Sequence, residues 1–317
     1  MKYLLFENQL ESHVRVRKWF YRLAFWIFAT VLLFALVRNA NWSLTFSRLS
    51  DVSLSTLLAC AGVWILSFVF RALRFQSEWK KFGKIPFLRA LRAIVLHNAA
   101  VVLVSFRVGE LGYPVLVREL IQVTWQQCIR SLLWLRFQDA IVLLLMAFLI
   151  FPVMNIELRI LTLCVAGCVL IATRKWWIRI LRSRHFLAGQ LRAFLHQRSD
   201  ALGWFWSLAN WTSKLSVVSL LLFSLLNVDA YQILCGSITG ELSALLPLTG
   251  PAGFGTYEAG VWLGLGLPWS QLSQVMSSIL LTHVFFLMIS LALAFLFLIV
   301  DGFNNLTLKS QQSSANA

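Results

Sequence analysis

Long apolar runs, separated by short polar stretches, extend along most of the chain and predict membrane-spanning helices. A helix needs about 20 consecutive apolar residues to cross the hydrocarbon core of a bilayer. Runs of or near this length cover residues 19–37, 54–70, 131–151, 156–173, 205–226 and 275–300, and residues 90–106 form a seventh candidate. The pattern predicts an all-α, polytopic integral membrane protein.

Two further stretches, at residues 109–125 and 230–266, are apolar but contain helix-breaking and charged residues. The second includes LPLTGPAGFGTYEAGVWLG (residues 246–264), which has five glycines, two prolines and one glutamate. Irregular backbone occurs at membrane depth only where protein or a water-filled cavity surrounds it. We therefore expect about eight membrane segments, two of which are broken or re-entrant helical hairpins, the second one turning at residues 249–256.

Basic residues are concentrated in the polar stretches between the apolar runs. The chain has 28 Lys and Arg against 13 Asp and Glu, a formal net charge of +15, and the stretches 71–92 and 174–198 hold seven basic residues each. Short loops rich in Lys and Arg stay on the cytoplasmic side of a membrane, so we expect these loops and the N-terminus to be cytoplasmic. The same rule explains the positive charge without a nucleic-acid partner.

The composition leaves no room for a soluble domain. Hydrophobic residues make up 59% of the chain and charged residues 13%, with a mean hydropathy of +0.75, whereas soluble domains are about half apolar and a quarter charged. We expect an N-terminal tail (1–18), a single transmembrane domain (19–303) and a polar, disordered C-terminal tail (304–317).

Ionisable residues also occur within or beside the apolar runs, where they are costly and usually face a protein interior or a wet cavity. They are Arg107, Glu110, Arg118, Arg136, Asp139, Lys214, Glu241 and Glu258. Arg136 and Asp139 are three residues apart, which places them on one face of a helix, and Arg107 and Glu110 have the same spacing. Each pair could simply hold helices together. Alternatively, the arginines line a cavity and bind a lipid phosphate, because the planar guanidinium donates two parallel hydrogen bonds.

The glycine-rich turn also has two interpretations. Glu258 lies close to the start of a half-helix that we expect to begin near Gly255, where a carboxylate stabilises the positive helix end. The free backbone N–H groups at this end could instead hold an anionic headgroup. Gly250, Gly253 and Gly255 would permit that close approach because they have no Cβ atom.

Other polar and small residues in the apolar segments are typical of helix packing. Gly260 and Gly264 form a GxxxG pattern, which favours close contact between helices. Asn98, next to His97, is expected to make an interhelical hydrogen bond, and His283 in the last run is expected to have a satisfied interior role.

No established catalytic motif is present in the sequence. It contains no HExxH, GxSxG or Walker A motif and no dense cluster of metal-ligating residues, so we expect neither catalysis nor a metal or cofactor. Two other classes remain open on the residues alone. One is a membrane-embedded lipid or glycan transferase, and the other is a non-catalytic accessory protein of cell-envelope synthesis.

Three segments, taken in order, resemble the signature of one membrane family. They are HNAAVVLVSFRVGELGYPVLVREL (97–120), LRFQDAIVLLL (135–145) and LLPLTGPAGFGTYEAGV (245–261). Together they are similar to the motifs of the lysylphosphatidylglycerol synthase transmembrane (flippase-like) family. The resemblance covers roughly residues 50–300.

The resemblance implies a polytopic membrane protein of bacteria or archaea, here of the bacterial cytoplasmic membrane. Its relatives are the lipid-translocating halves of multiple peptide resistance factors, which move aminoacylated phosphatidylglycerol between leaflets. The positions that match the family motifs are Asn98, Arg107, Gly109, Glu110, Arg118, Arg136, Asp139, Gly253, Gly255 and Glu258. Ser105 stands where the motif has proline, and Ala252 where it has glycine. No synthase domain accompanies these segments, so we expect no aminoacyl transfer from tRNA.

The resulting hypothesis is that the protein binds an anionic or aminoacylated phospholipid and translocates it between leaflets. Arg107 and Arg136 would hold the phosphate while Glu110 and Asp139 balance their charge. The turn from Gly250 to Gly255 would act as a hinge and backbone anion site. Arg118 and Glu258 are also expected to bind the headgroup, where Glu258 could sense an amine or a proton. Asn98, Lys214 and Glu241 would support the site. The partners would be membrane phospholipids and enzymes of cell-envelope lipid synthesis; the sequence does not indicate an oligomeric state.

Overall fold

The computed structural model describes residues 42–80, 82–103, 108–151, 155, 157–158, 160–162, 164–165, 201–245 and 250–315, with only the backbone for 302–315. The described residues are almost entirely helical and include no strand. The expected spans at 19–37 and, for the most part, 156–173 lie outside them. So do the N-terminal tail (1–18) and Arg107.

Four helical segments among the described residues are long and apolar enough to cross a membrane. They are α3 (Leu54–Trp79), α6 (Trp125–Ile150), α10 (Ala201–Leu225) and the segment Trp269–Asp301, which contains most of α13 (Leu272–Ala315). The prediction of an all-α, multi-pass membrane protein is confirmed at this level.

Polar side chains mark where three of the helices begin. Ser53 accepts a hydrogen bond from the Thr56 N–H at 3.2 Å at the start of α3. Thr124 and Gln127 form a capping box at the start of α6. Asp229 accepts from the Tyr231 N–H at 2.9 Å at the start of α11 (Ala230–Ser243). In each case a side-chain oxygen satisfies a backbone donor that has no partner within the helix.

Helix α3 is longer than its apolar run. The sequence predicted a span that ends at residue 70 and a basic loop from residue 71, but the helix continues to Trp79. Arg71 and Arg74 therefore belong to α3 and not to a loop, and Arg74 is only 5% exposed. Arginine is a good helix former, and the charges of these two side chains are directed into the bundle.

The first broken segment consists of α4 (Phe87–Leu103), a short 3₁₀ helix η1 (Val108–Leu111) and α5 (Gly112–Leu120). Helix α5 has nine residues, which at 1.5 Å per residue span about 13 Å, less than half of a bilayer core. Gly109 packs directly on α4, since a Cβ atom at this position would lie 2.1 Å from the Ala100 carbonyl oxygen. Only glycine allows this contact.

The second broken segment consists of α11, the 3₁₀ turn η2 (Pro251–Gly253) and α12 (Thr256–Leu265). Helices α11 and α12 pack closely through glycines on both sides. A Cβ atom on Gly264 would lie 1.9 Å from the Thr239 hydroxyl, and one on Gly260 would lie 2.7 Å from the Thr239 carbonyl. The packing interpretation of the GxxxG pattern is confirmed.

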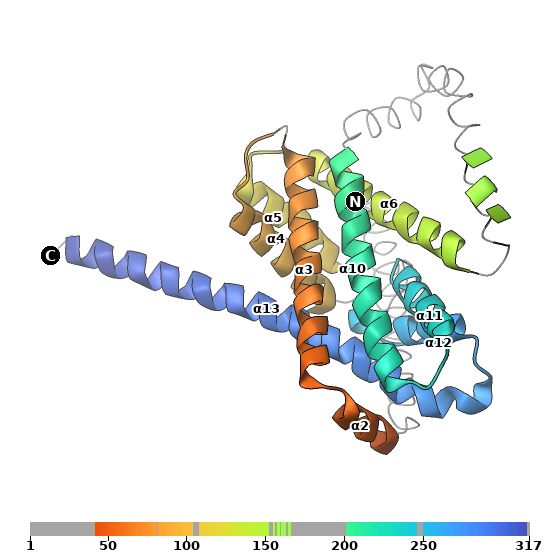
Figure 1. Ribbon diagram of the computed structural model, residues 1–317. Helices are drawn as coiled ribbons and strands as arrows, with labels where there is room; N and C mark the ends of the chain where they lie inside the picture. The colour runs from red at the N-terminus through yellow and green to blue at the C-terminus, as the bar shows by residue number, and fades with distance from the viewer. Residues whose placement is uncertain are drawn as a thin grey trace, which may run out of the picture.

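The helices form a bundle in which α3 and α10 run side by side and α13 crosses both of them (Figure 1). Helix α13 also contacts α4 and α12. It extends through Ala315 and projects beyond the rest of the bundle in Figure 1. The stretch 304–315, for which the sequence predicted disorder, is therefore helical.

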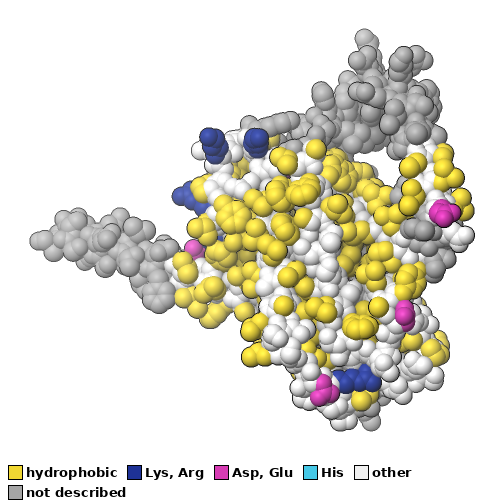
Figure 2. All heavy atoms as spheres, viewed as in Figure 1, with side chains coloured by type: hydrophobic (Ala, Val, Ile, Leu, Met, Phe, Trp, Pro, Cys, Tyr) yellow, Lys and Arg dark blue, Asp and Glu magenta, His cyan; other side chains and the backbone are white. Residues whose placement is uncertain are grey.

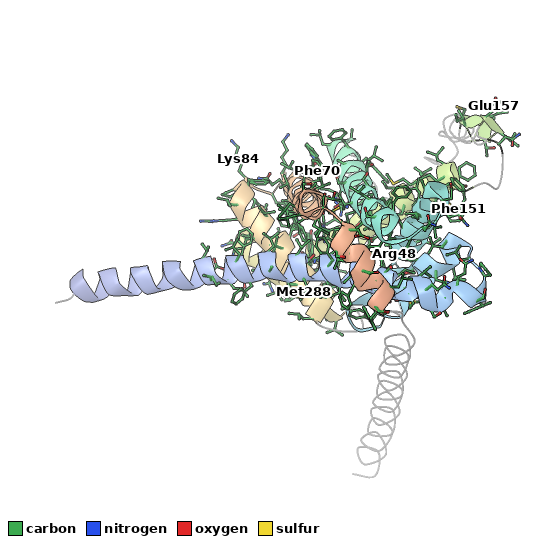
Figure 3. All side chains as sticks on the ribbon, turned by 60° about the horizontal axis from the view of Figure 1, so that its bottom comes forward. Arg48, Phe70, Lys84, Phe151, Glu157 and Met288 are labelled. Carbon is green, nitrogen blue, oxygen red and sulfur yellow. The ribbon has the colours of Figure 1, made fainter. Side chains whose placement is uncertain are left out.

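The outer surface of the bundle is largely apolar. In Figure 2, hydrophobic side chains cover most of the visible face, while Lys and Arg gather at its upper left and at its lower end. Figure 3 shows the labelled Lys84 in the loop before α4 and Arg48 on α2 (Trp42–Asp51), with Met288 on α13 between the two ends of that helix. Met288 is 60% exposed, and Phe223 on α10 is 53% exposed. Many large apolar side chains are exposed in the same way along these helices. An extended apolar surface is normally covered in the working protein, here by lipid.

Candidate functional site

A polar cavity of about 180 Å³ lies within the bundle, between α3, α4, α6, α10 and α11 and the short helices η1 and η2. Its walls contain cations, carboxylates and amides; the polar side chains are Arg71, Asn98, Glu110, Arg136, Asp139, Asn210, Trp211, Lys214 and Glu241. Gly250, Ala252 and Gly253 contribute the backbone of one wall. Cavities of about 150 Å³ hold a benzene molecule, so this one has room for a phosphate group and a few further atoms.

Most of the residues singled out from the sequence come together in this cavity. The predicted residues that line it are Asn98, Glu110, Arg136, Asp139, Lys214, Glu241, Gly250 and Gly253. They come from both broken segments and from α6 and α10. Ionisable residues scattered over about 150 positions of sequence therefore form one cluster.

Asp139 has its main partner on another helix. The Arg74 guanidinium donates to both carboxylate oxygens, at 2.5 and 3.2 Å, and both side chains are 6% exposed. The Trp211 indole donates to the same carboxylate at 2.8 Å. The pair predicted from spacing, Arg136 and Asp139, is only a 4.0 Å contact, because the carboxylate is turned towards α3.

Arg136 instead pairs with Glu110 of the first broken segment. Its guanidinium donates through Nη2 and Nε to the two Glu110 oxygens, at 3.1 and 3.3 Å. This two-point geometry is the one that makes arginine–carboxylate pairs directional. The contact attaches η1 to α6 and places both charges on the cavity wall.

Lys214 is held by a carboxylate and two aromatic rings. Its ammonium lies 3.0 Å from Glu241 Oε2, and 4.9 and 4.6 Å from the ring centroids of Trp64 and Trp211. Cation–π contacts of this kind stabilise a cation that has lost water. Lys214 and Glu241 therefore neutralise each other between α10 and α11.

Arg71 is the cation that the sequence-based prediction missed. Its guanidinium donates to Asn98 Oδ1 at 3.0 Å and lies over the Phe68 ring at 5.4 Å. None of the ion pairs between described residues includes Arg71. A signal was present in the sequence, because Ala72, Phe75 and Trp79 continue the apolar face of a helix past Arg71.

Two buried polar atoms beside the cavity also have no hydrogen-bond partner among the described residues. They are Asn210 Oδ1, on a residue that is 3% exposed, and His97 Nδ1, on a residue that is 4% exposed. Buried polar groups are almost always paired with protein or ordered water. These atoms therefore indicate that a polar molecule belongs in this part of the bundle.

Glu258 lies behind the glycine turn and not on the cavity wall. It is fully buried, and its Oε2 accepts a hydrogen bond from the Gly255 N–H at 2.6 Å. Its Oε1 lies 2.6 Å from His283 Nδ1 on α13. Glu258 thus stabilises the start of α12, and His283 has a carboxyl partner that the sequence did not reveal.

Arg118 lies apart from the cavity. It is in the last turn of α5, with its guanidinium 4.9 Å from the centroid of the Trp125 ring. It lines a separate surface pocket with Gln122, Thr124 and Gln127. The structure therefore does not bring Arg118 together with the other predicted headgroup ligands.

The fold and the cavity define a multi-pass helical membrane protein with a charged interior site. Comparison of the sequence with protein-family models finds no matching family, and no curated protein matches the chain.

Proposed function

We propose that the protein binds a phospholipid with an anionic or aminoacylated headgroup in this cavity and translocates it between the leaflets of the membrane. The observation that carries the proposal is Arg71, a cation on the cavity wall without a carboxylate partner among the described residues. Leaving a charge unpaired inside a protein is strongly unfavourable. A phosphate group entering the cavity would supply the missing partner.

A polar passage is what lipid translocation requires physically. The acyl chains of a lipid can stay in the hydrocarbon throughout, but moving an ionised headgroup through it is very costly. The remaining charges of the cavity pair with one another, as Arg136 does with Glu110 and Lys214 with Glu241. A headgroup would therefore meet a site whose described charges are already largely neutralised, with Arg71 as the cation that no described carboxylate pairs with.

The resemblance to the flippase-like family is part of the proposal. The clustering of Asn98, Glu110, Arg136, Asp139 and Gly253 around one cavity supports it, because these positions match the family motifs. We further propose about eight membrane segments with two broken hairpins, a cytoplasmic N-terminus and a location in the bacterial cytoplasmic membrane. Enzymes of cell-envelope lipid synthesis would be the partners that supply or use the lipid.

Replacement of Arg71 by glutamine tests the proposal. A hydrogen bond to a charged group contributes roughly 1.5–3 kcal/mol, so we expect Arg71→Gln to slow translocation about tenfold to a hundredfold. The measurement is the leaflet distribution of fluorescent phosphatidylglycerol in proteoliposomes. The fraction of the lipid in the outer leaflet is the fraction that a membrane-impermeant quencher reaches.

Arg118→Gln is the matched control, because it removes the same charge outside the cavity. It should keep the rate of the unaltered protein. Equal rates for the unaltered protein and Arg71→Gln, or for the unaltered protein and protein-free vesicles, would contradict the proposed function.

A further inference from the structure

His283 and Glu258 form a buried pair next to the cavity that the proposed function does not yet use. His283 Nδ1 lies 2.6 Å from Glu258 Oε1, and the second oxygen of Glu258 accepts the Gly255 N–H at 2.6 Å. The Glu258 side chain is fully buried and that of His283 is 10% exposed. The contact orients the imidazole with Nδ1 towards Glu258, and a neutral ring can donate Nδ1–H to the carboxyl oxygen.

The other edge of the imidazole faces the glycine turn of the cavity wall. A Cβ atom on Gly253 would lie 3.6 Å from His283 Cε1 and 3.8 Å from Nε2, and Gly253 itself lines the cavity. Nε2 has no hydrogen-bond partner among the described residues. Because Gly253 has no side chain, the imidazole lies directly behind the backbone of the cavity wall, next to the Phe254 ring.

We propose that His283 Nε2 binds a proton from the cavity, and that this proton and an anionic headgroup strengthen each other's binding. The inference rests on the proposed function and adds a second ligand to the same site. The proton is added to the lone pair of Nε2, while Nδ1–H remains directed at Glu258. No other bond is formed or broken.

The charge change explains the coupling. Protonation of His283 makes the net charge of the pair more positive by one. The added proton thus places one more positive charge behind Gly253 and favours an anion in the adjacent cavity. Binding free energies are reciprocal, so the anion favours the proton by the same factor. A proton gradient could then drive lipid movement.

Few other groups can perturb this pair directly. Tyr257, whose ring centroid lies 4.4 Å from that of His283, and Glu258 are its titratable neighbours on α12. On α2, α3, α4 and α10, Arg48 is engaged with the Leu225 carbonyl, Arg74 with Asp139, Glu78 with the Ser131 hydroxyl, Arg92 with Asp301, and Lys214 with Glu241. Asp51 and Arg89 are exposed on the surface. Arg71 on α3 faces the cavity, and His97 on α4 packs against Tyr113. The turn η2 has no titratable side chain.

The test is proton uptake on binding of glycerophosphoglycerol, a soluble phosphodiester headgroup whose own charge does not change in this range. Histidine side chains generally change charge between about pH 5 and pH 8. In weakly buffered detergent solution the unaltered protein should take up protons from an indicator dye as the probe binds. Its affinity should rise about tenfold from about pH 8 to about pH 5, within the usual range of coupling factors.

His283→Gln should still bind the probe but take up no proton, and its affinity should not change with pH. Arg118→Gln, which removes a charge outside the cavity, is the control and should keep both the uptake and the pH dependence. Thermal unfolding establishes that each variant is folded; if His283→Gln is not, proton uptake by the unaltered protein still decides the question.

The outcomes separate the two proposals. Probe binding without proton uptake, or uptake that survives in folded His283→Gln, would overturn the proton site and leave the proposed function standing. If the unaltered protein binds neither the probe nor any phospholipid at any pH, the proposed function fails, and the proton site fails with it.

Discussion

At the scale of single residues, most of the described charges around the cavity are paired with an opposite charge, and that of Arg71 is not. Asp139, Glu110 and Glu241 each have a cationic partner, whereas the partners of Arg71 among the described residues are an amide oxygen and an aromatic ring. The sequence indicated that these charges would gather but not how they pair. Spacing identifies neighbours on one helix, and the partner of Asp139 comes from a helix 65 residues away in sequence.

The buried pair of Arg74 and Asp139 makes a prediction about stability. Asp139→Asn leaves the Arg74 guanidinium buried without its counter-charge, which costs roughly 3–5 kcal/mol in comparable cases. We expect a loss of this size in the free energy of unfolding in mixed detergent micelles. Asp301→Asn is the control, because Arg92 and Asp301 are each about one-third exposed and such pairs contribute about 0–1 kcal/mol. Equal effects of the two substitutions would contradict the buried pairing.

At the scale of elements, helix breaks were predictable and one helix end was not. Glycine and proline correctly indicated the interruption between α11 and α12. The end of α3 was placed too early because Arg71 lowers the local hydropathy, although the helical periodicity continues to Trp79. The backbone of Ala252 could also be anticipated. Its φ is 53°, in the left-handed region that favours glycine. The resembled motif has glycine at this position.

The contact between α11 and α12 makes a second prediction about stability. Gly264→Ala would place a Cβ atom 1.9 Å from the Thr239 hydroxyl and 2.6 Å from the Cys235 carbonyl. Forcing these helices apart should cost about 1–3 kcal/mol, seen as a lower midpoint of unfolding.

Gly62→Ala in α3 is the control, since a Cβ atom there meets nothing within 4 Å. This substitution should leave the free energy of unfolding unchanged or raise it by up to about 1 kcal/mol, because alanine favours a helix more than glycine does. If both variants unfold at the same midpoint, the close packing of α11 on α12 is wrong.

At the scale of the whole molecule, the polar groups are inside and the apolar surface is outside. The two broken segments meet at the cavity, since η2 packs against α4 and Glu110 of η1 pairs with α6. Composition and apolar run length predicted the membrane class and an interior site. They could not predict the cavity's shape or its lining by Arg71 and Asn210, because these depend on how seven separate elements pack.

Retention of lipid by the purified protein tests the central claim most directly. Native mass spectrometry of the protein released from detergent should show a bound phospholipid on the unaltered chain and on Arg118→Gln. The same lipid should be lost from most molecules of Arg71→Gln. Equal retention by all three proteins, or no bound phospholipid on any of them, would contradict a headgroup site built around Arg71.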